Sequence, residues 1–253
     1  MSPLPPPPWG FFLDLDGTLI ELAETPRGIR TPAGLPGLLE RLHDRSGGAL
    51  ALVSGRTIEE LDRALHGLRL PAAGLHGLER RGLHGRVHRC VPDPRRSAPV
   101  WAGLADRIKR HPGLLAEQKG AAFAIHYRRV PALAGYAHRL ARQALAHLGP
   151  SYVLQSGKCV AELRPAGADK GDAVRAFLAE PAFRGRTPVF IGDDRTDEAG
   201  FAAVDAVGGI SIKVGPGPSR ARWRLADAKA VRGWLDTGRP APRRSRRPAR
   251  EAR

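Results

Sequence analysis

The chain has 253 residues, 42% of them hydrophobic, and a net charge of +16 at pH 7. This length allows one large domain or a core with a smaller inserted domain, and because no run of about 18 apolar residues occurs, a membrane-spanning helix is excluded. Cys90 and Cys159 are the only cysteines, which argues against a secreted disulfide framework. Because the first residues also lack the pattern of a secretory signal, we expect a cytoplasmic location.

Strands and helices alternate in the first third of the chain, after a proline-rich leader at residues 1–8. Apolar runs predict the strands, and leucines at helical spacing predict the first helix. The first predicted strand spans 10–15. Segment 49–56 is predicted to be a strand that ends in a polar turn, segment 72–81 a strand followed by a turn, and 85–90 an antiparallel return strand. The helices span 34–43 and the segment after a capping box of Thr57 and Glu60. This alternation favours a parallel sheet with crossover helices.

The middle of the chain has a different order of elements. We expect a hinge in the proline-rich segment 91–99, and then a helix over 100–110, a strand over 121–130, a helix over 131–148 and a hairpin over 151–165 that turns at Ser156–Gly157. Hairpin pairing replaces crossovers here. We therefore predict a separate α+β cap domain of residues 93–165.

The alternating pattern resumes after this insert. The expected elements are a helix that Asp169 caps and that ends near Glu180, a strand at 187–194, a short helix at 196–204, a strand at 209–215 and a helix at 226–238. The predicted fold class is therefore α/β. A Rossmann-like core, with helices on both faces of a parallel sheet, is built from residues 9–92 and 166–238 and interrupted by the cap domain.

The last fifteen residues, 239–253, contain seven Arg and one Glu, a net charge of +6 that leaves +10 on the rest of the chain. Their apolar side chains are no larger than Ala or Pro, so we expect a disordered tail. Such a tail can attract anions without specificity. We interpret it as a solvated segment, and we expect a monomer with no specific nucleic-acid partner.

Three of the predicted strands end in polar side chains. Asp14 and Asp16 follow the first strand, Ser54 and Arg56 the second, and Asp193, Asp194 and Asp197 a later one. Ligands of an open parallel sheet bind beyond the carboxyl ends of its strands, so we expect these groups to meet. Carboxylates with waters and phosphate are the ligands that Mg²⁺ prefers, and Lys170 adds a positive charge suited to phosphate.

These motifs, in this order, resemble the four motifs of the haloacid dehalogenase-like phosphohydrolases: DLDGTL at 14–19, SGR at 54–56, Lys170 before a helix, and GDDRTDE at 192–198. The resemblance implies that Asp14 attacks phosphorus and that Asp16 is the general acid and base. It implies that Ser54 and Lys170 bind the phosphoryl group, with Gly17, Thr18 and Arg56 beside the substrate. Mg²⁺ is then a ligand of Asp14, the Asp16 carbonyl and Asp193, while Asp194 and Asp197 act through water or orient the loop.

Further segments resemble the trehalose-6-phosphate phosphatases: AGLHGLERR at 73–81, HYR at 126–128 and GKCVAELRPAGADKG at 157–171. This resemblance implies Mg²⁺-dependent hydrolysis of trehalose 6-phosphate, with Lys158 and Glu162 of the cap binding sugar hydroxyls. Three alternatives stay open at this point. The substrate could be sucrose phosphate or a glycosyl-glycerate phosphate, the core could support a phosphotransfer mutase, or the chain could be a basic nucleic-acid-binding protein without enzymatic activity.

The spacing of His76, His84 and His88 does not fit a zinc site, and we expect them to be packing or surface residues.

Overall fold

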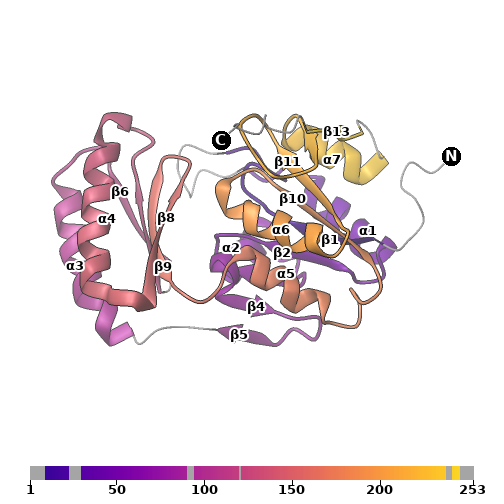
Figure 1. Cartoon of the computed structure of the whole chain (residues 1–253), viewed down its shortest axis with the longest axis horizontal. Helices are drawn as coiled ribbons and strands as arrows, with labels where there is room; N and C mark the ends of the chain where they lie inside the picture. The colour runs from indigo at the N-terminus through magenta and orange to yellow at the C-terminus, as the bar shows by residue number, and fades with distance from the viewer. Residues whose placement is uncertain (1–8, 23–29, 90–93, 120, 238–240, 246–253) are drawn as a thin grey trace, which may run out of the picture. The chain divides into compact units, whose positions relative to one another are not determined.

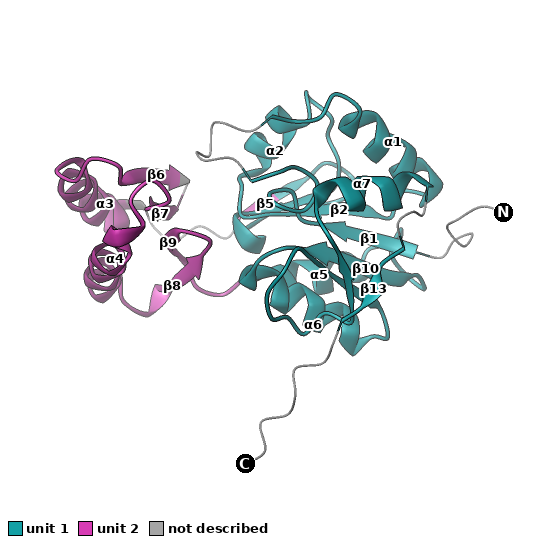
Figure 2. Ribbon diagram, turned by 90° about the horizontal axis from the view of Figure 1, so that it is seen from above, with its two compact units in different colours: residues 1–87, 169–253 teal, residues 88–168 magenta. Residues whose placement is uncertain are grey.

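The computed structural model describes residues 9–22, 30–89, 94–119, 121–237 and 241–245. The chain forms two compact units, residues 1–87 with 169–253 (unit 1) and residues 88–168 (unit 2) (Figure 2). Unit 2 extends slightly beyond the predicted cap, 93–165, at both ends. The predicted leader and the predicted tail residues 239–240 and 246–253 lie outside the described residues. Within those described, no helix combines the length and the apolar character needed to cross a membrane.

Unit 1 is built on a mainly parallel sheet (Figure 1). The strand order is β13-β12-β11-β10-β1-β2-β3-β4-β5. Parallel pairing runs from β12 to β3, whereas β4 and β13 pair antiparallel with their neighbours β3 and β12. The bounds are β1 Trp9–Leu13, β2 Leu50–Val53, β3 Ala72–Gly74, β4 Glu79–Arg81, β5 Val87–Arg89, β10 Thr187–Gly192, β11 Ile210–Val214, β12 Trp223–Leu225 and β13 Arg243–Arg244.

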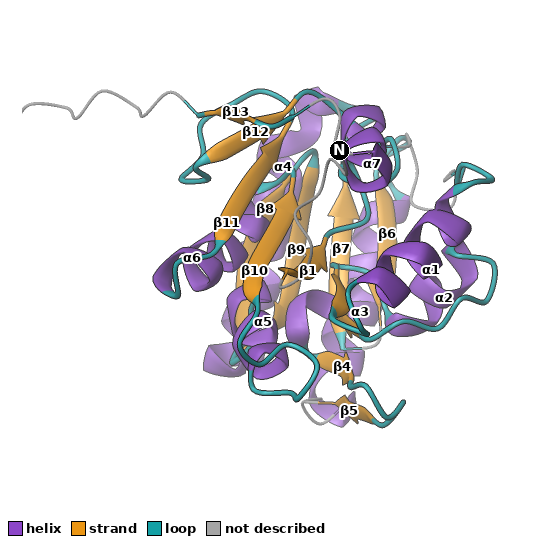
Figure 3. Ribbon diagram, turned by 90° about the vertical axis from the view of Figure 1, so that its right-hand side faces the viewer, coloured by secondary structure: helices purple, strands orange, loops and turns teal. Residues whose placement is uncertain are grey.

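Helices cover both faces of this sheet (Figure 3). Alternate strand residues point to opposite faces, so Phe11 and Leu13 belong to one apolar cluster and Phe12 to the other. The first cluster includes residues of α1 (Leu35–Arg45), α2 (Ile58–Ala64) and α7 (Ala228–Thr237), and the second includes residues of α5 (Lys170–Leu178) and α6 (Glu198–Ala206). The predicted α/β core is confirmed, and the Thr57–Glu60 capping box at the start of α2 is present.

The structure of unit 1 differs from the sequence prediction at two places. In segment 72–81 the expected strand and turn are present as β3 and a one-turn helix, Leu75–Gly77, in which Leu75 and His76 adopt left-handed backbone angles, but the strand β4 that follows was not predicted there. Disorder was expected throughout 239–253, yet Arg243–Arg244 forms β13. This edge strand depends on backbone pairing rather than on apolar side chains: Ser245 N donates to the Arg222 carbonyl at 2.9 Å, and the Arg244 guanidinium lies over the Trp223 ring.

Unit 2 is an antiparallel sheet in the order β6-β7-β9-β8 with a helical layer on one face. Its elements are α3 Pro94–Lys109, β6 Leu115–Lys119, β7 Ala122–His126, α4 Ala134–Leu148, β8 Tyr152–Gly157 and β9 Val160–Pro165, with one-turn helices at Pro131–Leu133 and Gly149–Ser151. Trp101, Leu104 and Ile108 of α3 are buried against Phe123 and Ile125 of β7. The α+β character predicted for the insert is therefore observed.

Two local predictions for unit 2 are wrong, and one strand was not predicted. The hinge expected at 91–99 lies in α3 from residue 94 onward, since Pro94 begins the helix, where a missing N–H removes no hydrogen bond. Residues 91–93 lie outside the described ranges. Strand β6 was not predicted, because the sequence LAEQK has only two apolar side chains. The hairpin turns at Lys158–Cys159 rather than at Ser156–Gly157, because Gly157 pairs with Val160.

Candidate active site

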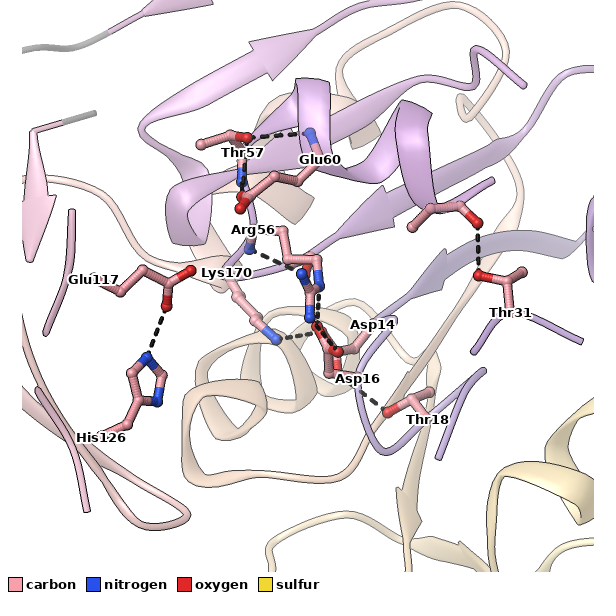
Figure 4. Close-up of polar contacts among 12 residues, drawn as sticks. Asp14, Asp16, Thr18, Thr31, Arg56, Thr57, Glu60, Glu117, His126 and Lys170 are labelled. Atoms are coloured by element: carbon pink, nitrogen blue, oxygen red, sulfur yellow. Dashed lines mark hydrogen bonds and ion pairs between the residues drawn. The ribbon is translucent and has the colours of Figure 1, made fainter. Parts of the chain in front are cut away.

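Asp14 lies directly after β1, at the carboxyl end of the parallel sheet. The residue is 4% exposed, and its N–H donates to the Ile191 carbonyl of β10 at 3.0 Å. Both carboxylate oxygens accept hydrogen bonds: Oδ1 from Lys170 Nζ at 2.8 Å and Oδ2 from Thr18 Oγ1 at 3.2 Å (Figure 4). The proposed nucleophile is therefore fixed in orientation by two residues that the sequence also placed in the site.

The electrostatics of Asp14 and Lys170 are set by their burial. Removal from water raises the pKa of the Asp14 carboxyl well above its usual value, and the nearby Asp197 and Asp193 raise it further, while Lys170 acts in the opposite direction. Burial alone would lower the pKa of the Lys170 ammonium, but the carboxylates of Asp14 and Asp197 raise it above its usual value. Lys170 is therefore a permanent positive charge beside the Asp14 carboxyl group.

Carboxylate oxygens of Asp14, Asp193 and Asp197 lie within 4.8 Å of one another, and all three side chains are buried. Buried carboxylates repel one another and need positive charge nearby. The single positive charge of Lys170 contacts a group of three carboxyl groups. Hard oxygen donors with excess negative charge are the ligand set that suits Mg²⁺. The residues present therefore fit a magnesium ion at this position.

Within this trio, Asp197 has a distinct role. Its Oδ1 accepts from Lys170 Nζ at 2.6 Å, and its Oδ2 accepts from the backbone N–H groups of Asp193 and Asp194, each at 2.8 Å. Both oxygens are thus already engaged in orienting the loop and the lysine, one of the two roles that the resemblance implied. Asp14 and Asp193, the side-chain ligands that the resemblance implied, have carboxylate oxygens within 4.8 Å of each other. Asp194 lies outside the trio, and its Oδ1 accepts from Arg195 N–H at 2.7 Å.

Asp16, which follows β1, and Arg56, which follows β2, form a bidentate ion pair. Arg56 Nε donates to Asp16 Oδ2 at 2.6 Å, and an Arg56 Nη donates to Oδ1 at 2.8 Å. The Asp16 side chain is 28% exposed, in contrast to the buried acids of the trio. A carboxyl group that is held in one orientation and reaches solvent can exchange a proton with a leaving group or a water.

The Ser54–Arg56 loop is hydrogen-bonded to Leu75 and His76, two residues with left-handed backbone angles. His76 N–H donates to the Ser54 carbonyl at 2.9 Å, and Leu75 N–H donates to the Arg56 carbonyl at 2.8 Å. Ser54 is 1% exposed, and its Oγ accepts from Arg56 N–H at 3.2 Å. The sequence analysis gave Leu75 no role in the site. The segment 72–81 was predicted to be a strand followed by a turn, which does not specify left-handed backbone angles.

Lys170 is placed by a capping box at the start of α5. Asp169 Oδ1 accepts from Asp172 N–H at 2.8 Å, and the Asp172 side chain accepts from Asp169 N–H at 3.0 Å. The expected helix cap at Asp169 is confirmed. Because Lys170 is the first residue of the helix, this cap also sets the direction in which its side chain leaves the backbone.

The sequence matches the trehalose-phosphatase family profile over residues 12–229. The chain belongs to the trehalose-phosphatase family. Trehalose-6-phosphate phosphatase of Escherichia coli K12 is 43% identical over 228 residues, 90% of this chain and 85% of that protein. A crystal structure of a trehalose-6-phosphate phosphatase related protein superimposes with a TM-score of 0.72 and 29% identity, covering 89% of this chain and 94% of that one.

The family assignment agrees with the fold. A haloacid dehalogenase-like hydrolase from Bacteroides thetaiotaomicron superimposes with a TM-score of 0.64 at 16% identity, covering 90% of this chain and 98% of that one. At this identity the likeness concerns the fold alone, and it confirms the haloacid dehalogenase-like core that the four motifs predicted.

The remaining predicted residues, Lys158 and Glu162, lie in unit 2. Lys158 is exposed in the β8–β9 turn, and Glu162 on β9 is 7% exposed. Glu162 is opposite Gln155 and Ala124, and Ala124 is opposite Glu117, so these side chains share one face of the sheet. On that face His126 Nε2 lies 2.7 Å from Glu117 Oε2. The sequence analysis missed Glu117, because β6 itself was not predicted.

Proposed function

We propose that the chain hydrolyses trehalose 6-phosphate to trehalose and phosphate, as a step of trehalose biosynthesis. The family membership and the 43% identity to the Escherichia coli enzyme support this substrate. The observation that carries the proposed chemistry is the arrangement around Asp14: a buried carboxylate in hydrogen-bond contact with a permanent cation, Lys170, at the carboxyl end of the sheet.

In the proposed first step, a carboxylate oxygen of Asp14 attacks phosphorus in line with the ester bond. The O–P bond of an aspartyl-phosphate forms as the ester P–O bond breaks, and Asp16 gives a proton to the leaving sugar oxygen. Thr18 and Lys170 keep the Asp14 carboxylate in one orientation, since each donates to one of its oxygens. Arg56 keeps Asp16 in place for the proton transfer.

In the second step, Asp16 takes a proton from a water molecule that attacks the phosphorus, which releases phosphate and restores Asp14. Lys170 and Ser54 interact with the phosphoryl oxygens in both steps, because phosphoryl transfer depends on positioning and charge neutralisation. Mg²⁺, when bound, neutralises charge on the acids and on the phosphoryl group. Asp14 and Asp193, with the Asp16 carbonyl, would be its ligands.

We further propose that Lys158 and Glu162 bind sugar hydroxyls and that the enzyme acts as a cytoplasmic monomer without a specific nucleic-acid partner. The sugar contact is supported by the position of Glu162 in a polar row of its sheet. The monomer and the location rest on composition alone.

Release of phosphate from trehalose 6-phosphate tests the function, in the presence of Mg²⁺ and of excess chelator. The expected result is turnover that chelator abolishes and that Asp14→Asn removes, while the exposed control Asp44→Asn on α1 retains it. A panel with sucrose 6-phosphate and a glycosyl-glycerate phosphate distinguishes the substrates. Undiminished turnover by Asp14→Asn contradicts the covalent scheme, and preference for another sugar phosphate contradicts the substrate.

A further inference from the structure

A second buried lysine, Lys213, lies behind the acidic loop. It is on β11, its residue is 5% exposed, and it belongs to none of the motifs that pointed to the site. Its Nζ donates to the backbone carbonyl of Asp193 at 2.6 Å and to the carbonyl of Val214 at 2.7 Å. Strand β11 is parallel to β10 with Lys213 opposite Gly192, so the ammonium links the carboxyl ends of the two strands.

The backbone of Asp193 is therefore bound on both sides. Its N–H donates to Asp197 Oδ2 at 2.8 Å, and its carbonyl accepts from Lys213. With both of its peptide groups held, the residue has little freedom to rotate, and its carboxylate stays against Gly17, where a Cβ would lie 2.2 Å from Asp193 Oδ2. The direction of a metal-binding carboxylate is thus set by a residue that does not itself offer an oxygen ligand.

Burying a lysine ammonium group carries a large desolvation free energy. A methionine of similar length would fill the same space without that cost, so packing alone does not account for Lys213. Charge-assisted hydrogen bonds are shorter and stronger than neutral ones, and the 2.6 Å contact with the Asp193 carbonyl is of that kind.

We propose that Lys213 is a positioning residue that fixes Asp193 for Mg²⁺ binding. This inference rests on the proposed use of Mg²⁺ by the same site. Two effects of removing Lys213 have opposite signs. Loss of a nearby positive charge alone would tighten Mg²⁺ binding, whereas loss of the Asp193 anchor would weaken it. The sign of the change in Mg²⁺ affinity therefore separates positioning from simple electrostatics.

The test is titration calorimetry of Mg²⁺ into substrate-free enzyme, which needs no turnover. Lys213→Met is expected to raise the Mg²⁺ dissociation constant about tenfold or more. Lys213→Gln retains a hydrogen-bond donor without the charge and is expected to lie between Lys213→Met and the wild type. Lys229→Met, at an exposed lysine of α7, is the matched control and should bind as the wild type does. Circular dichroism melting without Mg²⁺ shows whether each variant folds.

An unchanged or lower dissociation constant in folded Lys213→Met would overturn the proposal while leaving the proposed phosphatase function intact. If Lys213→Met does not fold, Lys213→Gln is judged by the same criterion. Failure of the wild type itself to bind Mg²⁺ would overturn both this proposal and the proposed use of the metal. A kinetic readout supports the distinction: the Mg²⁺ concentration for half-maximal activity should rise in Lys213→Gln, while the KM for the sugar phosphate stays unchanged.

Discussion

Gly17 and Asp193 approach each other so closely that no side chain fits between them. A Cβ at Gly17 would lie 2.2 Å from Asp193 Oδ2 and 2.5 Å from its carboxyl carbon, and the φ of Gly17 is +78°. The glycine that follows Asp16 thus gives the chain a left-handed turn and also leaves the space that the second acid occupies. The loops after β1 and β10 meet at this contact.

Gly17→Ala is therefore expected to lose most Mg²⁺ affinity and turnover, because Asp193 must move. Left-handed backbone angles cost a residue with a Cβ about 1–2 kcal/mol, and the clash adds to this loss of unfolding free energy. The control is Gly67→Ala, where φ is +90° and nothing lies within 4 Å of a Cβ. It should show the backbone cost in urea denaturation with unchanged phosphate release. Equal activity of the two variants would show that the Gly17–Asp193 contact is not needed.

The sequence predicted the residues of the site better than their geometry. Asp14, Lys170 and Asp193 could be found because a phosphoryl-transfer site needs fixed residue types at strand ends, and Asp169 because a helix cap has a local pattern. Leu75 and His76 could not, since their left-handed angles depend on hydrogen bonds to the Ser54–Arg56 loop, far away in the sequence. The role of Arg56 as partner of Asp16 and the burial of Lys213 likewise depend on tertiary contacts that no local pattern encodes.

Arg56→Lys is expected to reduce kcat by up to about a hundredfold, because lysine cannot make the two parallel hydrogen bonds that orient Asp16. The matched control is Arg63→Lys, which changes an exposed arginine paired with Glu59 on α2 and should retain the wild-type rate. Steady-state kinetics at saturating Mg²⁺ measures both. If Arg56→Lys raises KM and leaves kcat unchanged, Arg56 serves substrate binding and not the orientation of Asp16.

Asp169→Ala removes the cap of α5 and is expected to cost about 1 kcal/mol of unfolding free energy. Because Lys170 is the first residue of that helix, kcat should also fall. Asp227→Ala provides the comparison: Asp227 Oδ1 accepts from Ala230 N–H at 2.8 Å at the start of α7, so a similar stability loss is expected there without a kinetic effect. Thermal denaturation and phosphate release separate the two contributions. A kcat unchanged in Asp169→Ala would remove the cap from the list of groups that place Lys170.

The metal-free protein should become less stable relative to Asp14→Asn as the pH rises. Burial, with Asp197 and Asp193 nearby, raises the pKa of Asp14 in the folded state above its unfolded value. The stability that its protonated form contributes is full below about pH 4 and is lost as the pH rises through the folded pKa. Melting curves of the wild type and of Asp14→Asn in chelator, from pH 4 to 8, should therefore diverge in favour of the variant. A constant difference across this range would contradict the assigned pKa shift.

Mg²⁺ should reverse this difference in stability, since the proposed site binds it through the ionised carboxylates of Asp14 and Asp193. A ligand at a hundred times its dissociation constant stabilises the folded state by about 2.7 kcal/mol. The wild type should gain a stabilisation of that order at saturating Mg²⁺, and Asp14→Asn, which lacks one carboxylate, should gain much less. Equal increases in melting temperature for the two proteins would indicate that Mg²⁺ binds elsewhere.

Lys158 and Glu162 can be tested by comparing two substrates of the same enzyme. If their side chains bind sugar hydroxyls, Lys158→Ala and Glu162→Gln should raise the KM for trehalose 6-phosphate about tenfold, which corresponds to about one charge-assisted hydrogen bond. The KM for p-nitrophenyl phosphate, which has no sugar, should stay the same, because Asp14, Ser54 and Lys170 are untouched. Lys109→Ala, at an exposed lysine of the same unit, is the control. A parallel rise for both substrates would indicate a general loss of structure in unit 2, and unchanged values for both would remove the two residues from the sugar site.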